Sequence, residues 1–195
     1  MAKPESTADT DSVILIDGSS YVYRAYHALP PLTTSTGQPT GAVRGVTTMV
    51  MRILEDHPNS PIGMIFDAKG DTFRHEMYKE YKANRPPMPD DLRPQIQPIY
   101  DIVEALGIKI FVVDNVEADD VIAFLSRFTK FRDWQKVIVS SDKDFIQILD
   151  DKTVLLRPIQ NEVLNTNKVL DNYGIHPNNF ALARAISGDN SDNLK

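Results

Sequence analysis

The chain has 195 residues, of which 42% are apolar, and this is enough for one globular domain with a full core. It has no cysteine, which excludes disulfides and thiolate zinc sites and fits a cytoplasmic location, and no apolar run long enough to span a membrane. The net charge of -6 argues at first against a nucleic-acid partner.

Short apolar runs alternate with amphipathic segments along the chain. Residues 1–12 are polar, and we expect them to form a disordered tail. The predicted strands are Val13–Ile16, Ile62–Phe66, Ile108–Val113, Val137–Ser140 and an edge strand Thr153–Leu156. The predicted helices are 42–55, one that ends near Leu106, Val121–Arg127, Thr166–Tyr173 and Pro177–Ser187.

The connections carry turn and cap signals. Asp17–Ser20 predicts a turn after the first strand, and the prolines and glycines of 30–41 predict a loop. Asp90 or Asp91 is expected to cap the helix that ends near Leu106, with a kink at Pro98 and a stop at Gly107.

The predicted strands are apolar on both faces and alternate with helices. This pattern indicates an α/β fold with a mostly parallel central sheet covered by helices on both faces. In such sheets ligands bind beyond the carboxyl ends of the strands. No second domain is indicated, so residues 13–195 are expected to form one core.

Nine carboxylates recur where predicted elements begin or end. The densest group is Val116-Glu117-Ala118-Asp119-Asp120, at the predicted start of a helix. One or two such residues would serve as caps, but three repel one another unless a cation lies among them. The full set comprises Asp17, Asp67, Glu117, Asp119, Asp120, Asp142, Asp144, Asp189 and Asp192.

Carboxylates that meet at one rim of a sheet need protons or hard cations. Oxygen ligands suit Mg²⁺ or Mn²⁺, and two such ions can clamp a phosphodiester. If the nine hold metal, basic residues outnumber the remaining acidic ones, and a nucleic-acid partner is no longer disfavoured. Each Asp taken alone is also explained as a turn or cap residue.

The segment 69–87 combines basic and aromatic side chains. On a helix, Arg74, Tyr78, Tyr81 and Arg85 would share one face, with Lys82 beside it. Such a face suits stacking on a base and contact with phosphate, although a solvated amphipathic helix is the simpler alternative. Arg24 is placed either to reach a phosphate or to cover the loop after the first strand.

These residues resemble a known family. From about Val13 to Lys195 the chain is similar to the 5′-nuclease domain of bacterial DNA polymerase I, within the flap endonuclease and 5′–3′ exonuclease family. The motifs that carry the resemblance are Leu15-Ile16-Asp17-Gly18-Ser19-Ser20-Tyr21, Phe66-Asp67-Ala68-Lys69-Gly70, Tyr81-Lys82-Ala83-Asn84-Arg85-Pro86-Pro87-Met88-Pro89, Val116-Glu117-Ala118-Asp119-Asp120, Ser141-Asp142-Lys143-Asp144 and Gly188-Asp189-Asn190-Ser191-Asp192-Asn193.

The resemblance implies a PIN-like fold, two Mg²⁺ or Mn²⁺ ions and a helical arch, formed by 69–95, over the site. It assigns Asp17, Asp67, Glu117, Asp119 and Asp120 mostly to one ion, and Asp142, Asp144, Asp189 and Asp192 mostly to the other, with Asp119 and Asp142 shared. Catalytic roles fall on Lys82, Arg24 and Arg85, and contacts to nucleic acid fall on Arg24, Arg74, Tyr78, Tyr81, Lys82 and Arg85.

The activity implied is that of a monomer that cleaves DNA, or RNA–DNA, at flaps and single-stranded 5′ ends and leaves a 5′-phosphate, in replication and repair. The family continues into a helix-hairpin-helix that holds duplex DNA, with K⁺ expected only where that region is present; this chain stops before it. Two alternatives stay open: a weakly active or non-catalytic nucleic-acid-binding module of the same fold, and a generic PIN-type ribonuclease or toxin, which would need fewer carboxylates.

Overall fold

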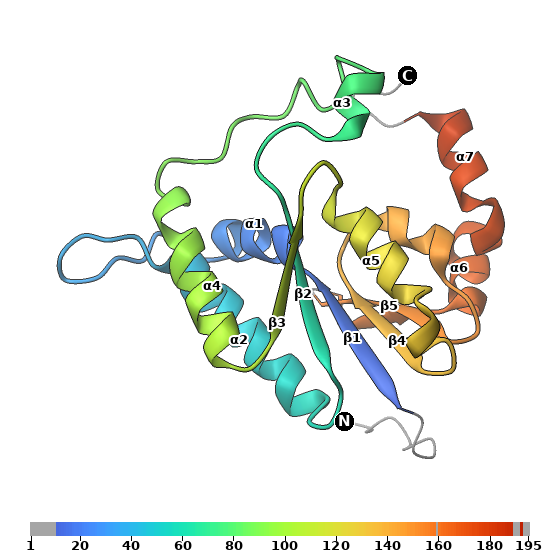
Figure 1. Ribbon diagram of the computed structural model, residues 1–195, viewed down its shortest axis with the longest axis horizontal. Helices are drawn as coiled ribbons and strands as arrows, with labels where there is room; N and C mark the ends of the chain where they lie inside the picture. The colour runs from blue at the N-terminus through green and yellow to red at the C-terminus, as the bar shows by residue number, and fades with distance from the viewer. Residues whose placement is uncertain (1–10, 159, 189–191, 193–195) are drawn as a thin grey trace.

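The computed structural model describes residues 11–158, 160–188 and 192. These residues form a six-stranded sheet in the order β3-β2-β1-β4-β5-β6, in which β1 to β5 are parallel and β6 is antiparallel (Figure 1). The predicted mostly parallel sheet is therefore confirmed. The strands are β1 Ser12–Asp17, β2 Ile62–Asp67, β3 Lys109–Val113, β4 Gln135–Val139, β5 Thr153–Arg157 and β6 Glu162–Leu164.

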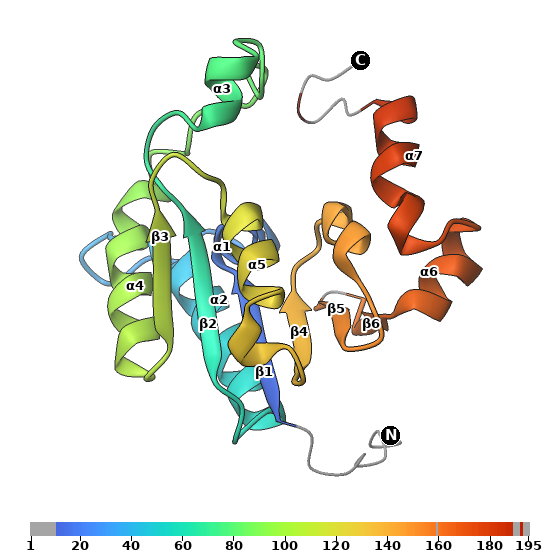
Figure 2. The same cartoon turned by 45° about the vertical axis from the view of Figure 1, so that its right-hand side comes forward.

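Helices lie on both faces of this sheet (Figures 1 and 2). None in the described part of the chain is long and apolar enough to cross a membrane. The α-helices are α1 Gly18–Ala28, α2 Gly41–Asp56, α3 Phe73–Met77, α4 Ile96–Ala105, α5 Ala118–Ser126, α6 Thr166–Tyr173 and α7 Phe180–Ser187. Short 3-10 helices are η1 Arg93–Gln95, η2 Thr129–Phe131, η3 Lys143–Ile148 and η4 Pro177–Asn179.

Strand alternation divides the core into two layers. Ile14 and Ile16 of β1 pack with buried residues of α1, α2 and α4. Val13 and Leu15, which point to the other face, pack with buried residues of α5, α6 and α7. Both faces of β1 are therefore covered, which explains its uninterrupted apolar sequence.

The order of the strands places a crevice beside β1. β1 pairs with β2 on one side and with β4 on the other, so the direction of the chain's progress across the sheet reverses there. Ligands of open α/β sheets bind beyond the carboxyl ends of the strands at such a switch point. The segment that carries α3 rises over this edge (Figure 2).

The turn predicted at Asp17–Ser20 is wrong, because α1 begins at Gly18, directly after β1. The Asp17 side chain caps α1 by accepting a hydrogen bond from the Ser20 backbone N–H at 2.9 Å. A Cβ at Gly18 would lie 2.8 Å from the Ile65 carbonyl oxygen. Close packing of α1 on β2 therefore requires glycine there.

The single helical face predicted for 69–87 is also wrong. α3 ends at Met77, and turns follow it to Arg85. Lys82 has a φ of 54°, which an α-helix does not accommodate. The segment makes its long-range hydrogen bonds through polar side chains and through the backbone N–H groups of Phe73 and Lys82, so no apolar stripe holds it helical.

The predicted start of α4 needs two corrections. Neither Asp90 nor Asp91 caps it, since Asp91 accepts a hydrogen bond from the Tyr26 hydroxyl at 2.8 Å and α4 follows η1. Pro98 lies in the first turn of α4, where its missing N–H removes no helical hydrogen bond, so the helix runs uninterrupted to Ala105. Gly107, with a φ of 79°, lies just past the end of α4, as predicted.

Smaller differences concern element ends. Ser12, expected in the tail, already belongs to β1, while residues 1–10 lie outside the described residues. β5 is not an edge strand, because β6 pairs with it. α6 is capped by the Asn165 side chain and not by Thr166. α5 begins at Ala118, before the predicted Val121, which makes Glu117 its N-cap.

Candidate active site

The carboxyl ends of β1 and β4 hold Asp17 in place. Its second carboxylate oxygen accepts a hydrogen bond from the Ser140 hydroxyl at 2.7 Å, and the Asp142 backbone N–H donates to the same hydroxyl at 3.0 Å. Ser140 therefore links the two strand ends across the switch point. Burial raises the pKa of Asp17 to about 6, against the hydrogen bonds that lower it.

Asp67 joins the end of β2 to the start of α5. Its carboxylate accepts a hydrogen bond from the Ala118 backbone N–H at 2.8 Å, and its own backbone N–H donates to the Ser19 hydroxyl at 3.0 Å. The end of β2 is thus held to the starts of α5 and α1 by one acidic and one hydroxyl side chain.

The first turn of α5 carries the dense acidic group. Asp120 accepts a hydrogen bond from the Glu117 backbone N–H at 3.0 Å, as in a capping box. Asp119 faces the other carboxylates, and burial raises its pKa to about 8. Repulsion from Asp17, Asp142 and Asp67 adds to this shift.

Asp142 and Asp144 follow β4 on η3. The Asp142 carboxylate caps η3 by accepting from the Asp144 backbone N–H at 2.8 Å. Asp144 accepts a hydrogen bond from the Arg184 Nε atom of α7 at 3.2 Å. This contact brings α7, the last helix among the described residues, to the rim of the sheet.

These carboxylates line one cleft of approximately 790 Å³, which we call the acidic cleft. The acidic residues around it are Asp17, Asp67, Glu117, Asp119, Asp120, Asp142, Asp144 and Asp192. Asp189 lies outside the described residues. The structure therefore brings together every predicted metal ligand that it describes.

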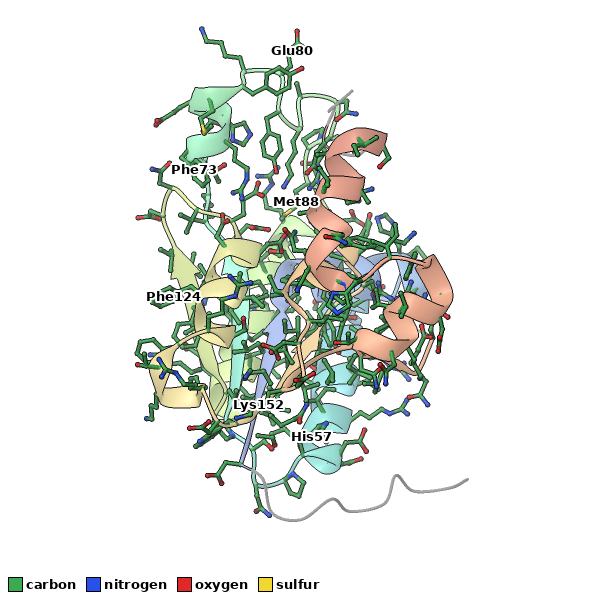
Figure 3. All side chains as sticks on the ribbon, turned by 90° about the vertical axis from the view of Figure 1, so that its right-hand side faces the viewer. His57, Phe73, Glu80, Met88, Phe124 and Lys152 are labelled. Carbon is green, nitrogen blue, oxygen red and sulfur yellow. The ribbon has the colours of Figure 1, made fainter. Side chains whose placement is uncertain are left out.

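The arch (69–95) covers the acidic cleft and supplies cations to it. Arg74 donates two hydrogen bonds to Asp120, at 2.6 and 2.7 Å, which lower the pKa of that carboxyl. Lys82 Nζ lies 2.7 Å from a carboxylate oxygen of Glu117. The raised position of the arch is visible in Figure 3, where Phe73, Glu80 and Met88 mark its course.

The remaining predicted arch residues also line the acidic cleft. The Tyr81 hydroxyl donates to Glu117 at 3.0 Å and Arg85 pairs with Asp192 at 2.5 Å. Tyr78, which is 40% exposed, donates to Glu80. The Tyr81 ring is only 7% exposed and packs edge-on against His75, so no open ring face is available for a base in this conformation.

Arg24 does not line the cleft. It lies on α1, where burial lowers the pKa of its guanidinium, and its Nε and Nη1 atoms are buried without a hydrogen-bond partner among the described residues. The predicted role of Arg24 in the chemistry is therefore not visible as a contact.

Sequence reasoning missed the residues that support this site. Ser19 and Ser140 hold the backbone and Asp17 in position, and Arg184 faces Asp144. The run Ser140-Ser141-Asp142 after a strand is a usable signal, because hydroxyls at strand ends often hydrogen-bond nearby backbone. Arg184 gives no comparable sequence signal; it is the one charged residue of an otherwise mostly apolar helix.

Within the described part of the chain, no three carboxylate or histidine side chains are close enough together to hold a metal ion as they stand. Several of the acidic groups instead bind arch cations, as Glu117 binds Lys82 and Asp120 binds Arg74. The cleft thus has its negative charge partly neutralised by the protein itself.

The sequence matches the family model described as the 5′-3′ exonuclease N-terminal resolvase-like domain over residues 12–174. It is 48% identical to the DNA polymerase I of Pseudomonas aeruginosa, over 93% of this chain and 20% of that protein. It is 39% identical to a 5′-3′ exonuclease of Buchnera aphidicola subsp. Schizaphis graminum, over 93% of this chain and 64% of that protein. The chain therefore spans less than two thirds of either relative.

Solved structures share the fold. The T5 D15 protein co-crystallized with metal ions matches with a TM-score of 0.73 at 18% identity, over 93% of this chain and 68% of that one. A complex of the bacteriophage T5 D15 flap endonuclease with DNA and metal ions matches with a TM-score of 0.70 at 16% identity, over 93% of this chain and 68% of that one. At these identities the likeness shows the fold alone.

Proposed function

Because the chain belongs to the 5′-3′ exonuclease family, we propose that its acidic cleft hydrolyses phosphodiester bonds at flaps and single-stranded 5′ ends of DNA or RNA–DNA, leaving a 5′-phosphate. The observation that carries this proposal is the gathering of carboxylates from β1, β2, α5 and the start of η3 in one cleft, which the arch residues Arg74, Lys82 and Arg85 also line. Arginine and lysine side chains beside such a cluster can contact the phosphates of a polynucleotide backbone.

Divalent metal ions fit this donor set. The cleft offers oxygen ligands without thiolates, which suits Mg²⁺ or Mn²⁺. Burial and mutual repulsion raise the pKa values of Asp17 and Asp119, so a positive charge placed between them would be stabilised. Two ions, when bound, would supply an activated water and charge stabilisation for the leaving oxygen.

The sides of the cleft support a division between two ions. The β1, β2 and α5 side would hold one ion, and the β4 side, with Asp142 and Asp144, would hold the other. Asp119 and Asp142 would serve both, since repulsion between them already contributes to the raised pKa of Asp119. Asp189 and Asp192 complete the proposed second set.

The arch is proposed to bind the substrate backbone. Lys82 and Arg85 already neutralise carboxylates of the cleft, at Glu117 and Asp192. If metal ions were bound by these carboxylates, Lys82 and Arg85 would be placed to contact the scissile phosphate and its neighbour. Arg74 holds Asp120 by two hydrogen bonds and would position the first turn of α5.

Arg24 is proposed to contact a neighbouring phosphate of the substrate. Two of its nitrogen atoms are buried without partners among the described residues, and a buried donor of this kind is costly until an acceptor reaches it. The Arg24 side chain would have to move to make this contact, because it lies outside the lining of the cleft.

A cleavage assay tests the proposal. End-labelled flap, single-stranded and duplex DNA are incubated with the chain and Mg²⁺, Mn²⁺ or chelator, and the products are sized and their ends identified. Metal-dependent products with 5′-phosphates are expected. Binding without cleavage under every condition would instead favour a non-catalytic nucleic-acid-binding module. The ion pairs of Asp120 and Glu117 with arch residues are the observation that favours testing this alternative.

A further inference from the structure

Four aromatic rings run in a row from α5 to β4. We call this the aromatic row: Phe124, Phe128, Phe131 and Trp134. Successive ring centroids lie 5.8, 6.3 and 5.3 Å apart. Such spacings are those of interacting aromatic pairs, so the rings support one another.

The outer half of the row does not belong to the core. α5 already buries Ala118 and Ile122 against the sheet. Phe131 and Trp134 pack against that core, but Phe124 and Phe128 belong to neither core cluster and are 64% and 41% exposed. An amphipathic helix normally carries polar residues on its solvent face, so exposed rings there call for another explanation.

The two exposed rings line a hollow that adjoins the acidic cleft. Its volume is approximately 490 Å³, and its walls are Ala123, Phe124, Arg127, Phe128 and Thr129. Ala123 also lines the acidic cleft, and about one helix turn separates Asp120 from Phe124. Phe124 lies on α5 below Phe73, on the same side of the molecule in Figure 3.

Cations accompany the rings. Arg127 and Lys130 follow α5 on either side of Phe128, and neither side chain takes part in an ion pair among the described residues. The N-terminal end of α5 is strongly acidic, whereas this C-terminal end is basic. A polyanion with flat apolar groups would satisfy both features of the surface.

We propose that the aromatic row is a binding site for unpaired nucleotides of a single strand that also occupies the acidic cleft. Bases stack on Phe124 and Phe128, and the intervening phosphates contact Arg127 and Lys130. The site rests on the proposed function, since it takes the same strand that is cut in the cleft. It makes no contact that distinguishes one base from another.

Binding of labelled oligodeoxythymidylates of increasing length, measured by fluorescence anisotropy in chelator, tests the site without cleavage. The variant is Phe124→Ala with Phe128→Ala, and the control is Leu182→Ala with Ile186→Ala, which removes exposed aliphatic groups from α7. Oligomers long enough to leave the cleft should bind the aromatic variant about fivefold to about thirty-fold more weakly, for one or two stacked bases. Replacing both rings by Tyr should restore binding.

A second arm does not depend on how well the ring variant folds. Arg127→Ala with Lys130→Ala should reduce the slope of log affinity against log salt by about 1.4, because each phosphate contact to a single strand contributes about 0.7. The chain has one tryptophan, Trp134, at the inner end of the row. Its fluorescence should change when long oligomers bind and should not change with oligomers confined to the cleft.

The outcomes separate the possible occupants. Length-dependent losses in the ring variant, with the control unchanged, support the site even if no metal-dependent cleavage is found, in which case only the proposed function fails. Equal affinity of the parent and ring variant for long oligomers overturns the inference. Self-association that disappears in the ring variant, with oligomer binding intact, also overturns it and assigns the row to contact between copies of this chain.

Discussion

Replacing Asp119 by asparagine is expected to stabilise the metal-free chain. The Asp119 carboxyl is surrounded by Asp17, Asp142 and Asp67, and burial with these charges raises its pKa from 3.8 to about 8. The folded chain therefore keeps this carboxyl mostly protonated near neutral pH, and at pH about 8 and above it carries a carboxylate that it disfavours. An amide of the same shape removes that charge and keeps the packing.

The magnitude follows from the shift in pKa. Each unit corresponds to about 1.4 kcal/mol, so the full shift would exceed 5 kcal/mol if solvent did not screen the charges. The cleft is open to water, and we therefore expect a gain on the order of 2 kcal/mol for Asp119→Asn at pH about 8.

The difference in bound protons between the folded and unfolded states determines whether the stability rises or falls with pH. The folded state binds more protons than the unfolded state between the two pKa values, 3.8 and about 8, so the stability of the parent chain falls as pH rises through that window. Asp119→Asn loses this contribution, and its stability should depend less steeply on pH. The stability of Asp119→Asn should still depend on pH to a smaller extent, because the pKa of Asp17 is raised to about 6.

Urea denaturation in chelator at pH about 5 and about 8 measures both effects. Asp171→Asn, an exposed carboxylate on α6, is the matched control. The advantage of Asp119→Asn should be larger at the higher pH, and Mg²⁺ should reverse the order by stabilising the parent. A variant that is less stable than the parent at both pH values, or an advantage that does not change with pH, would refute the reasoning.

Three further predictions concern the arch and the fold. Lys82→Ala should lower the single-turnover cleavage rate more than substrate affinity, and equal small effects would place Lys82 outside the chemistry. Tyr81→Phe should cost about 1 kcal/mol of metal-free stability in urea denaturation, because it removes a buried hydroxyl with two carboxylate acceptors; unchanged stability would contradict this. Gly18→Ala should cost about 2 kcal/mol, since its Cβ would lie 2.8 Å from the Ile65 carbonyl, whereas Gly41→Ala, whose nearest neighbour is 3.6 Å away, should be close to neutral; equal effects of the two would show that the α1–β2 contact relaxes.

The sequence was sufficient to predict where the carboxylates converge. Asp17, Asp67 and Asp142 each follow an apolar strand, and parallel strands bring their carboxyl ends to one edge. This prediction requires only the order of strands and helices along the chain, and no knowledge of individual contacts. It is therefore unaffected by α1 and β6, which were not predicted.

Contacts between residues that are far apart in the sequence could not be predicted from local sequence patterns. Arg74 and Asp120 are 46 positions apart, and their pairing depends on how the arch lies over α5. The spacing of Arg74, Tyr81 and Arg85 predicted a helical face, yet the side chains reach the cleft from a short helix followed by turns. Polar contacts to the cleft, and not helical periodicity, hold this segment in place.

The capping of α2 shows the same limit. Its N-terminal Ala42 N–H donates to the side chain of Gln95, which is 2% exposed and lies 53 positions later, at 2.8 Å. Thr40, the local candidate, makes no side-chain cap. A buried amide that satisfies a helix start from another element leaves no signal in the neighbouring sequence.

Counting bound divalent ions tests the central claim, that the acidic cleft is a metal site, most directly. Mn²⁺ is titrated into the chain and into Asp142→Asn, and free Mn²⁺ is followed by electron paramagnetic resonance. The parent is predicted to bind about two ions, and Asp142→Asn about one or none, because Asp142 would serve both ions. Equal binding by the two proteins, or no binding by the parent, would contradict the assignment of this cleft as the catalytic metal centre.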